Sequence, residues 1–543
     1  MGVDFEIMFT KNSNNSNFGR ATLIIAVFSL LAKILGLVRD AVFSHQFGAG
    51  TVIDAYFAAF RVPDFIYNLL ILGTFSVAFI PVFSEYLITD KQKADRLVSS
   101  ITNVTLLMVL LLTVLAFIFI NPLVSTIAPG FVGEAYELTK LFTMIFLISP
   151  LLLTLSSIVS SILNTYKKFT LVAIAPVIYN LSIIAGAIWF YPLWGARGLA
   201  YGVVLGALLH FIIQLPQVFR LGFRYSFAID WADAGFRKYW RLYWPRIFSM
   251  GTSQITALIV SIFGSFLGTG ALASFYYANN LQAVALSLFA VSFAIAAFPL
   301  LSDLYNKKDI LGFKDVIAKT AIQILFFMIP ISILMLVLRA QIVRLVLGIG
   351  QSTNFTFTDT SMVARALGLF AISLFAQSLI PLFTRAFYAL QNTIIPVVIG
   401  FMTIFVNLIF TFWLSRRLGI SGMVLAFSIS SVINLILLIV ELHRKLGNVH
   451  DEYLIINTLK IVISSLVAGA ATFVSLYVFA PIVDMRTYWG VLVQGGAAAL
   501  IGTALYLTTG WGLGLSESHN LINLLRITGK KLGRPINIIW NWF

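Results

Sequence analysis

Charged side chains interrupt one strongly apolar stretch of this sequence, residues 29–85, where two long hydrophobic runs flank the glycine-rich turn 47–50. The six that lie among apolar neighbours are Lys33, Arg39, Asp40, Asp54, Arg61 and Asp64. A charge at bilayer depth costs a few kcal/mol, so such side chains usually face a polar cavity or a partner. Guanidinium groups bind phosphate oxygens in pairs and an amine adds a mobile point charge. The stretch therefore indicates a site for an anionic substrate, and a diphosphate fits it.

The spacing of these charges leaves their pairing open. Asp54 and Arg61 are seven residues apart, which places them on one face of a helix, and Asp64 follows one turn later. A salt bridge satisfied within this helix is the alternative to a substrate site. Lys33 and Arg39 are six residues apart and share no face of a straight helix, so both point inward only if the helix kinks, for example at Gly36.

Simpler roles are also open for the first three charges. Lys33 can extend its amine to the membrane interface, and Arg39 can form a local ion pair with Asp40 at the helix end.

The composition places the chain among polytopic α-helical membrane proteins. Hydrophobic residues make up 59% and charged residues only 10%, whereas about a quarter of a soluble domain is charged. The absence of Cys excludes disulfides and thiolate metal sites. The net charge of +15 arises largely in short loops between apolar runs, which is the positive-inside pattern and not a nucleic-acid surface.

Fourteen apolar runs are long enough to span a bilayer, which takes about 20 residues. We predict an all-α fold with spans at 21–46, 52–86, 100–124, 137–164, 170–192, 198–219, 243–267, 271–304, 317–346, 362–388, 394–414, 420–442, 456–482 and 488–511. The spans 52–86 and 271–304 exceed one crossing and are expected to tilt, kink or project. Basic residues in alternate loops predict that both termini are cytoplasmic.

Internal repeats divide the spans into two lobes. The string FSVAFIPVFSEY (75–86) matches FAIAAFPLLSDL (293–304), and the glycine pairs at 195–198 and 419–422 match at a similar offset. Parallel repeats of this kind are related by an axis along the membrane normal, with a cavity between them. We predict a cytoplasmic tail (1–19), an N-lobe (20–222), a cytoplasmic interlobe loop (223–242), a C-lobe (243–447), two further helices (448–512) and a cytoplasmic amphipathic tail (513–543).

The second lobe offers amides where the first has charges. Asn279, Asn280 and Gln282 stand near the position that matches Arg61, and they can bind sugar hydroxyls or satisfy one another. Arg246 is the nearby cation, and it reaches the cavity or anchors its helix at the interface. Two further amides, Asn180 and Asn407, are expected to bridge helices.

The motifs of other chemistries do not occur. The five His are scattered and there is no Walker loop or HExxH sequence, so we expect no catalytic site, metal or cofactor, and no ATP-driven transport.

Several strings resemble the lipid II flippase MurJ (MviN) family of the multidrug/oligosaccharidyl-lipid/polysaccharide exporter superfamily. They are KILGLVRDA (33–41), FGAG (47–50), DAYFAAFRVP (54–63), GTFSVAFIP (73–81), NTYKKFTLVAIAP (164–176) and FYALQN (387–392). The resemblance implies two six-helix lobes around a cationic cavity, with the last two helices forming a groove for a polyprenyl tail. It also implies that Lys33, Arg39, Asp54 and Arg61 line the cavity. The chain departs from the family at Asp64, at the second-lobe amides and at Thr411, where an acidic residue of a sodium site would fall.

The resemblance implies a flippase that moves undecaprenyl-diphosphate-linked peptidoglycan precursor, lipid II, outward by alternating access. Its expected partners are that precursor, membrane lipid and cell-wall synthesis proteins. An exporter of another polyprenyl-diphosphate glycan remains open, as does a non-transporting cell-wall scaffold, which would tolerate mutation of the cavity. A drug/cation antiporter would need an acidic cavity.

Overall fold

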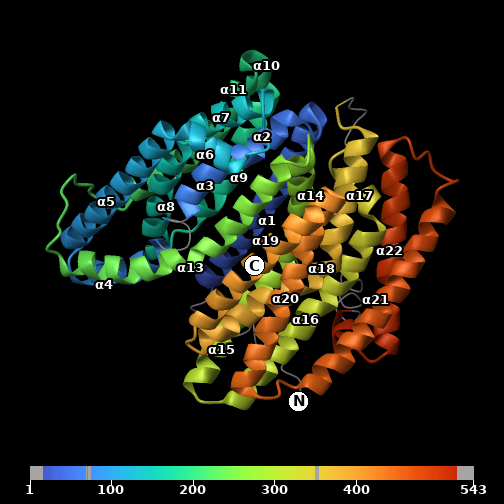
Figure 1. Cartoon of the computed structure of the whole chain (residues 1–543). Coiled ribbons are helices and arrows are strands. Elements are labelled where there is room, and N and C mark those ends of the chain that lie inside the picture. Colours follow the sequence, from blue (N-terminus) through green and yellow to red (C-terminus); the bar gives the residue numbers. More distant parts are fainter. Residues whose placement is uncertain (1–15, 69, 71–74, 349–353, 522–543) are drawn as a thin grey trace, which may run out of the picture.

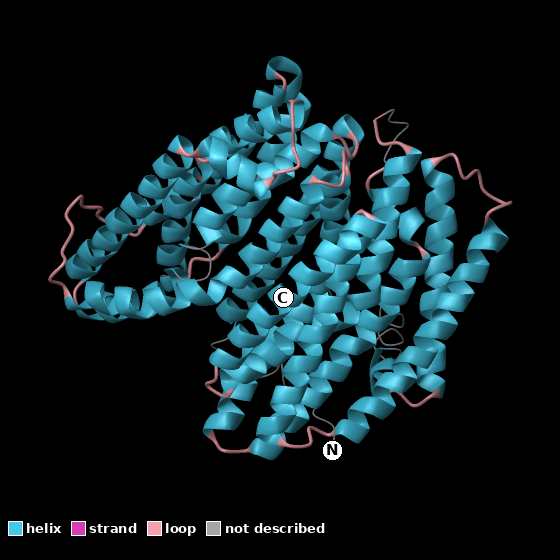
Figure 2. Ribbon diagram, in the orientation of Figure 1, coloured by secondary structure: helices cyan, strands magenta, loops and turns pink. Residues whose placement is uncertain are grey.

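The computed structural model describes the backbone of residues 16–68, 70, 75–348 and 354–521, and the side chains within these ranges except those of residues 16–23, 75–78 and 245–253. The protein is an all-α polytopic membrane protein, and this part of the chain contains helices and no strands (Figure 2). Eleven of its helices are long and apolar enough to cross a membrane, and shorter apolar helices cover 79–89 and 254–265. Every one of the fourteen predicted spans coincides with one or more helices.

In the residues that the structure describes, the first lobe is built of α-helices and a π-helical turn. They are α1 (Ser16–Phe47), α2 (Thr51–Ala59), α3 (Arg61–Tyr67), α4 (Phe75–Thr89), α5 (Lys91–Ile118), α6 (Ile120–Ile127), α7 (Glu134–Phe146), α8 (Ser149–Thr165), α9 (Thr170–Ala185), the π-turn Gly186–Phe190, α10 (Tyr191–Trp194), α11 (Ala196–Ile212) and α12 (Leu215–Arg220). The long span predicted at 52–86 breaks at Phe60, between α2 and α3. Phe60 itself keeps right-handed helical dihedral angles, with φ of −67° and ψ of −18°.

The second lobe forms a separate group of helices in Figure 1. It contains α13 (Ala234–Ser265), α14 (Ala271–Ala285), the π-turn Leu286–Val291, α15 (Ser292–Asn306), α16 (Ile310–Val337), α17 (Arg339–Val346), α18 (Phe357–Ala389), α19 (Ile394–Leu418) and α20 (Ile420–Leu446). The last two spanning helices, α21 (Asp451–Phe479) and α22 (Tyr488–Gly512), lie beside this lobe. The Tyr506 hydroxyl of α22 donates to the Phe326 carbonyl of α16 at 2.6 Å.

The two lobes share local backbone geometry at matching positions. Gly195 and Gly419, which precede α11 and α20, have φ, ψ of 58°, −143° and 59°, −136°. Both lie in a region of positive φ that favours glycine. A Cβ on Gly198 would meet the Phe190 carbonyl, and one on Gly422 would meet the Leu414 carbonyl. The repeats seen in the sequence therefore correspond to repeated turns.

The connection between the lobes is more helical than predicted. The Asp233 carboxylate accepts a hydrogen bond from the Phe236 amide at 2.8 Å and caps α13, which begins at Ala234 inside the predicted loop 223–242. The segment before it follows α5, where the Asn103 side-chain amide donates to the carbonyls of Ser226 and Ala228 at 3.0 and 3.1 Å. The connection is thus packed onto the first lobe.

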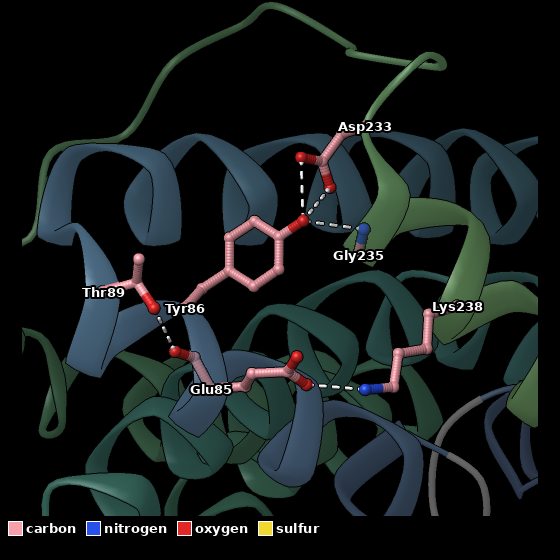
Figure 3. A network of polar contacts seen from close by, with 6 residues as sticks. All are labelled: Glu85, Tyr86, Thr89, Asp233, Gly235 and Lys238. Carbon is pink, nitrogen blue, oxygen red and sulfur yellow. Dashed lines mark hydrogen bonds and ion pairs between the residues drawn. The ribbon is translucent and has the colours of Figure 1, made fainter.

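A polar network fixes the start of α13 to the end of α4 (Figure 3). The Tyr86 hydroxyl donates to Asp233 at 3.1 Å and accepts from the Gly235 amide at 2.8 Å. Lys238 and Glu85 form an ion pair at 2.6 Å. A Cβ on Gly235 would lie 2.7 Å from the Tyr86 ring, so this close approach requires glycine.

Candidate functional site

The two lobes are joined by hydrogen bonds around the turn 47–50, at one end of the molecule, which we call the closed end. The Ser44 hydroxyl donates to the Leu347 carbonyl at 2.6 Å, and the Asn354 side chain donates to the Gln46 carbonyl at 2.8 Å. The opposite half of α1 carries exposed apolar side chains such as Ile34 and Val38. The helix α1 runs between the two groups of helices (Figure 1), and exposed apolar side chains of a spanning helix face lipid as readily as a cleft.

Asp54 joins α2 of the first lobe to α14 of the second, and we call the contact of α1, α2 and α3 with α14 the seam. Its carboxylate accepts from the Gly270 amide at 2.5 Å and from the Ala273 amide at 2.7 Å, and the residue is only 2% exposed. The first N–H groups of a helix lack partners within the helix, and their positive dipole end favours an anion. The carboxylate predicted to line a substrate site therefore caps α14 of the other lobe.

Asp40 joins α1 to the same helix. Its Oδ1 is 2.8 Å from Arg39 Nη2, and its Oδ2 accepts from the Asn280 amide at 2.8 Å. Asp40 is 1% exposed, whereas the Arg39 side chain keeps 20% of its surface. The local ion pair is present, and Asn280 binds this carboxylate. Arg39 donates to Asp40 through Nε and Nη2. A guanidinium group has five N–H donors, so Arg39 keeps others that bind no carboxylate of the described residues.

Arg61 lies at the seam with a loosely held carboxylate. Its Nη2 is 3.5 Å from Asp64 Oδ2, and its guanidinium lies 5.2 Å from the centre of the Tyr276 ring in α14. The Asp64 side chain is 38% exposed and that of Arg61 12%. Arg61 pairs with Asp64, one turn along α3, and not with Asp54, whose carboxylate is bound by the start of α14. The internal salt bridge exists, but at 3.5 Å it is longer than an ordinary N–H···O hydrogen bond.

Lys33 is exposed and makes no hydrogen bond or ion pair with the residues that the structure describes. The helix α1 runs through Gly36 without interruption, so the structure shows no break there. Gly36 instead lies against Asn180, whose side chain donates to the Ala32 carbonyl at 3.5 Å. Asn180 thus bridges α9 and α1, and Asn407 bridges α19 and α20 through Ser430 at 3.2 Å, as predicted.

The second-lobe amides largely satisfy one another. Buried Gln282 donates to the Asn279 side chain at 3.2 Å and bonds with Gln377 of α18 at 3.3 Å. Gln377 in turn donates to the Ser373 hydroxyl at 3.0 Å. The side chain of Arg246, a further predicted site residue, lies outside the described residues. Sugar binding by these amides therefore requires them to exchange partners.

Arg385 is a cation that the sequence interpretation missed. It lies on α18 two turns beyond Gln377, and its Nη1 donates to the Pro381 carbonyl of its own helix at 3.2 Å. No carboxylate of the described chain pairs with it. The signal in the sequence was an Arg inside the apolar run 362–388, which is the same signal that marked Arg61.

Comparison with known proteins gives a consistent result. A family model described as "Lipid II flippase MurJ" matches residues 43–491. The chain is 27% identical over 519 residues to the "Probable lipid II flippase MurJ" of Haemophilus influenzae, which covers 91% of this chain and 99% of that protein. The corresponding protein of Buchnera aphidicola subsp. Acyrthosiphon pisum is 29% identical over 469 residues, or 85% and 91% of the two chains. A solved structure titled "Lipid II flippase MurJ, inward closed conformation" superposes with a TM-score of 0.75 at 26% identity, over 90% of this chain and 98% of that one.

Proposed function

This chain belongs to the lipid II flippase MurJ family, and we propose that it moves lipid II by alternating access, with the diphosphate held by first-lobe cations. The protein is a multi-pass protein of the bacterial cytoplasmic membrane and its substrate is lipid II. The observation that carries the proposal is the position of Arg61 at the seam between the lobes, with only a 3.5 Å contact to Asp64.

The orientation we propose puts both termini in the cytoplasm. The half of the lobes opposite the closed end also lies there, and in this proposal it is the open half. The basic loops support it, because they follow the positive-inside pattern. In this orientation the closed end, with Asp54 and the start of α14, faces the outside. The lipid II headgroup then enters the cleft from the cytoplasmic leaflet.

Three cations are available to the diphosphate. Lys33 is exposed and without a partner in the described chain, Arg39 has spare N–H groups, and Arg61 holds Asp64 loosely. Arg385 adds a cation from the second lobe. Arginine pairs phosphate oxygens bidentately, and charge-assisted hydrogen bonds are about twice as strong as neutral ones. Asp54 does not oppose the anion, because its charge is directed into the α14 terminus.

Substrate binding also acts on the closed end in this proposal. Arg39 neutralises Asp40, which holds Asn280 of the second lobe, and Arg61 lies over Tyr276 of the same helix. A diphosphate that draws both guanidinium groups toward itself weakens these contacts between α1, α3 and α14. A ligand shifts a conformational equilibrium only through such differential contacts. Loss of the closed-end contacts then favours the outward-open state.

The polyprenyl tail is proposed to lie along the second lobe beside α21. An apolar cavity of about 160 Å³ between α16 and α18, lined by residues such as Ile333, Leu336 and Phe375, supports this position. Gly469 of α21 lies against Ile333. The tail thus has an apolar route near the two C-terminal spans.

Growth of a bacterium that lacks its own lipid II flippase tests the function. The wild-type chain is expected to restore growth, and Arg39→Ala is expected to abolish it at equal protein level, because Asp40 loses its counter-charge and the diphosphate a donor. Arg417→Ala is the matched control, since Arg417 is exposed at the end of α19 and should not matter. Full growth with Arg39→Ala would contradict the assignment of Arg39.

A further inference from the structure

A second polar cavity lies away from the seam, where α16 and α21 begin. Its volume is about 570 Å³, and Lys314 of α16 and Lys460 of α21 face it together with the amides of Asn448 and Asn457. We propose that this cavity binds the phosphate headgroup of an anionic phospholipid. The site is separate from the lipid II cleft and does not depend on the flippase mechanism.

Both lysines lack a counter-ion. Each is partly buried, and neither forms an ion pair or a side-chain hydrogen bond with the described residues. Lys319, five residues along α16, instead pairs with Asp315 at 2.7 Å. A partly buried charge is costly unless it is paired. Two such amines that line one cavity favour the binding of an anion.

The carboxylate inside the cavity does not supply that anion. Asp451 Oδ1 is 2.7 Å from His443 Nε2, and His443 Nδ1 is 2.9 Å from the Ile439 carbonyl. A carbonyl only accepts, so Nδ1 carries a hydrogen, and the contact with Asp451 places a hydrogen on Nε2 as well. The imidazolium thus neutralises Asp451. Glu452 also borders the cavity but is exposed to solvent.

The surroundings favour a lipid over a free phosphate. Leu311 and Ile456 line the cavity and are 74% and 44% exposed, and Tyr453 lies beside them. Lys460 is nine residues into α21, about 14 Å along a helix that is longer than the hydrocarbon thickness of about 30 Å. Long basic side chains near helix ends extend their amines toward the headgroups. Basic pockets between spanning helices at the cytoplasmic side bind anionic lipid headgroups.

Lipid binding to the purified full-length protein tests the proposal. Native mass spectrometry and thermal unfolding would be measured with phosphatidylglycerol, with phosphatidylcholine of the same chains, and with inorganic phosphate. We expect phosphatidylglycerol to bind and to raise the unfolding temperature, and Lys314→Gln/Lys460→Gln to weaken this binding about tenfold or more, because two charge-assisted contacts are lost. Lys319→Gln is the matched control and should behave as wild type, because Lys319 is exposed and already paired.

Three outcomes would overturn the proposal. These are equal phosphatidylglycerol binding by the double variant and wild type, equal stabilisation by phosphatidylcholine, and a matching effect of inorganic phosphate alone, which would indicate a free-phosphate site. The single variants Lys314→Gln and Lys460→Gln, each expected to show an intermediate loss, keep the test valid if the double variant does not fold.

Discussion

Asp54→Asn is expected to open the closed end of the protein and to lower lipid II flipping about 10- to 100-fold. The carboxylate accepts two short backbone hydrogen bonds from α14 in a buried position. In the Asn variant the side-chain oxygen still accepts one of these hydrogen bonds. The side-chain NH2 group faces the second backbone N–H group, and because both are donors, that buried N–H group loses its partner. The substitution also removes the negative charge from the positive end of the helix. The lobes would then no longer hold the state in which the cytoplasmic half is open.

The opening can be measured directly because the chain has no Cys. Spin labels on Cys introduced at Gln46 and Asn354, which are in contact across the closed end, report the distance between the lobes. We expect a longer and broader distance distribution in Asp54→Asn than in the parent. Asp303→Asn is the control, because Asp303 is an exposed carboxylate on α15 away from the seam. An unchanged distribution in Asp54→Asn would show that this carboxylate does not hold the lobes together.

Arg61→Gln is expected to weaken lipid II binding about 10- to 100-fold, since charge-assisted hydrogen bonds to a desolvated phosphate contribute about 1.5–3 kcal/mol. Gln fills a similar space but carries no charge. Arg61→Lys should retain part of the affinity, because an amine supplies charge without the bidentate geometry. Affinity of the purified protein for lipid II, titrated in detergent, is the measurement.

Arg365→Gln provides the control for Arg61, because Arg365 is an exposed arginine on a spanning helix and forms no ion pair with the described residues. It should bind lipid II as wild type does. If Arg61→Gln and Arg365→Gln bound lipid II equally well, Arg61 of α3 would not bind the diphosphate.

The spans and their order were predictable because apolar length and basic loops determine them almost independently of tertiary contacts. The breaks within spans are not set by apolar length, but a proline in the run indicates this one. Phe60 ends α2, and Pro63, three residues further on, lacks the N–H group that would bond to the Ala59 carbonyl. The expectation that Asp54 and Arg61 share one helix face did not reveal that the second lobe binds the Asp54 carboxylate.

The identity of the charged residues was predictable, but their partners were not. Asp40, Asp54 and Arg61 stand out in sequence as charges among apolar residues. Their contacts with Asn280, the α14 terminus and Tyr276 depend on how the second lobe docks, more than 200 residues further along the chain. The start of α13 was predictable but was missed. Asp233 is a residue type that commonly caps a helix, whereas the aromatic and basic composition of 223–242 led us to predict a loop there.

Transport of lipid II in vesicles containing the purified full-length protein tests the central claim most directly. Lipid II that reaches the outer leaflet would be quantified by an enzyme that cleaves it, added outside sealed vesicles. Wild-type protein should move lipid II, and the variant Arg39→Gln/Arg61→Gln should move almost none at equal reconstitution. Transport by the double variant at the wild-type rate would contradict a diphosphate site built from these two arginines.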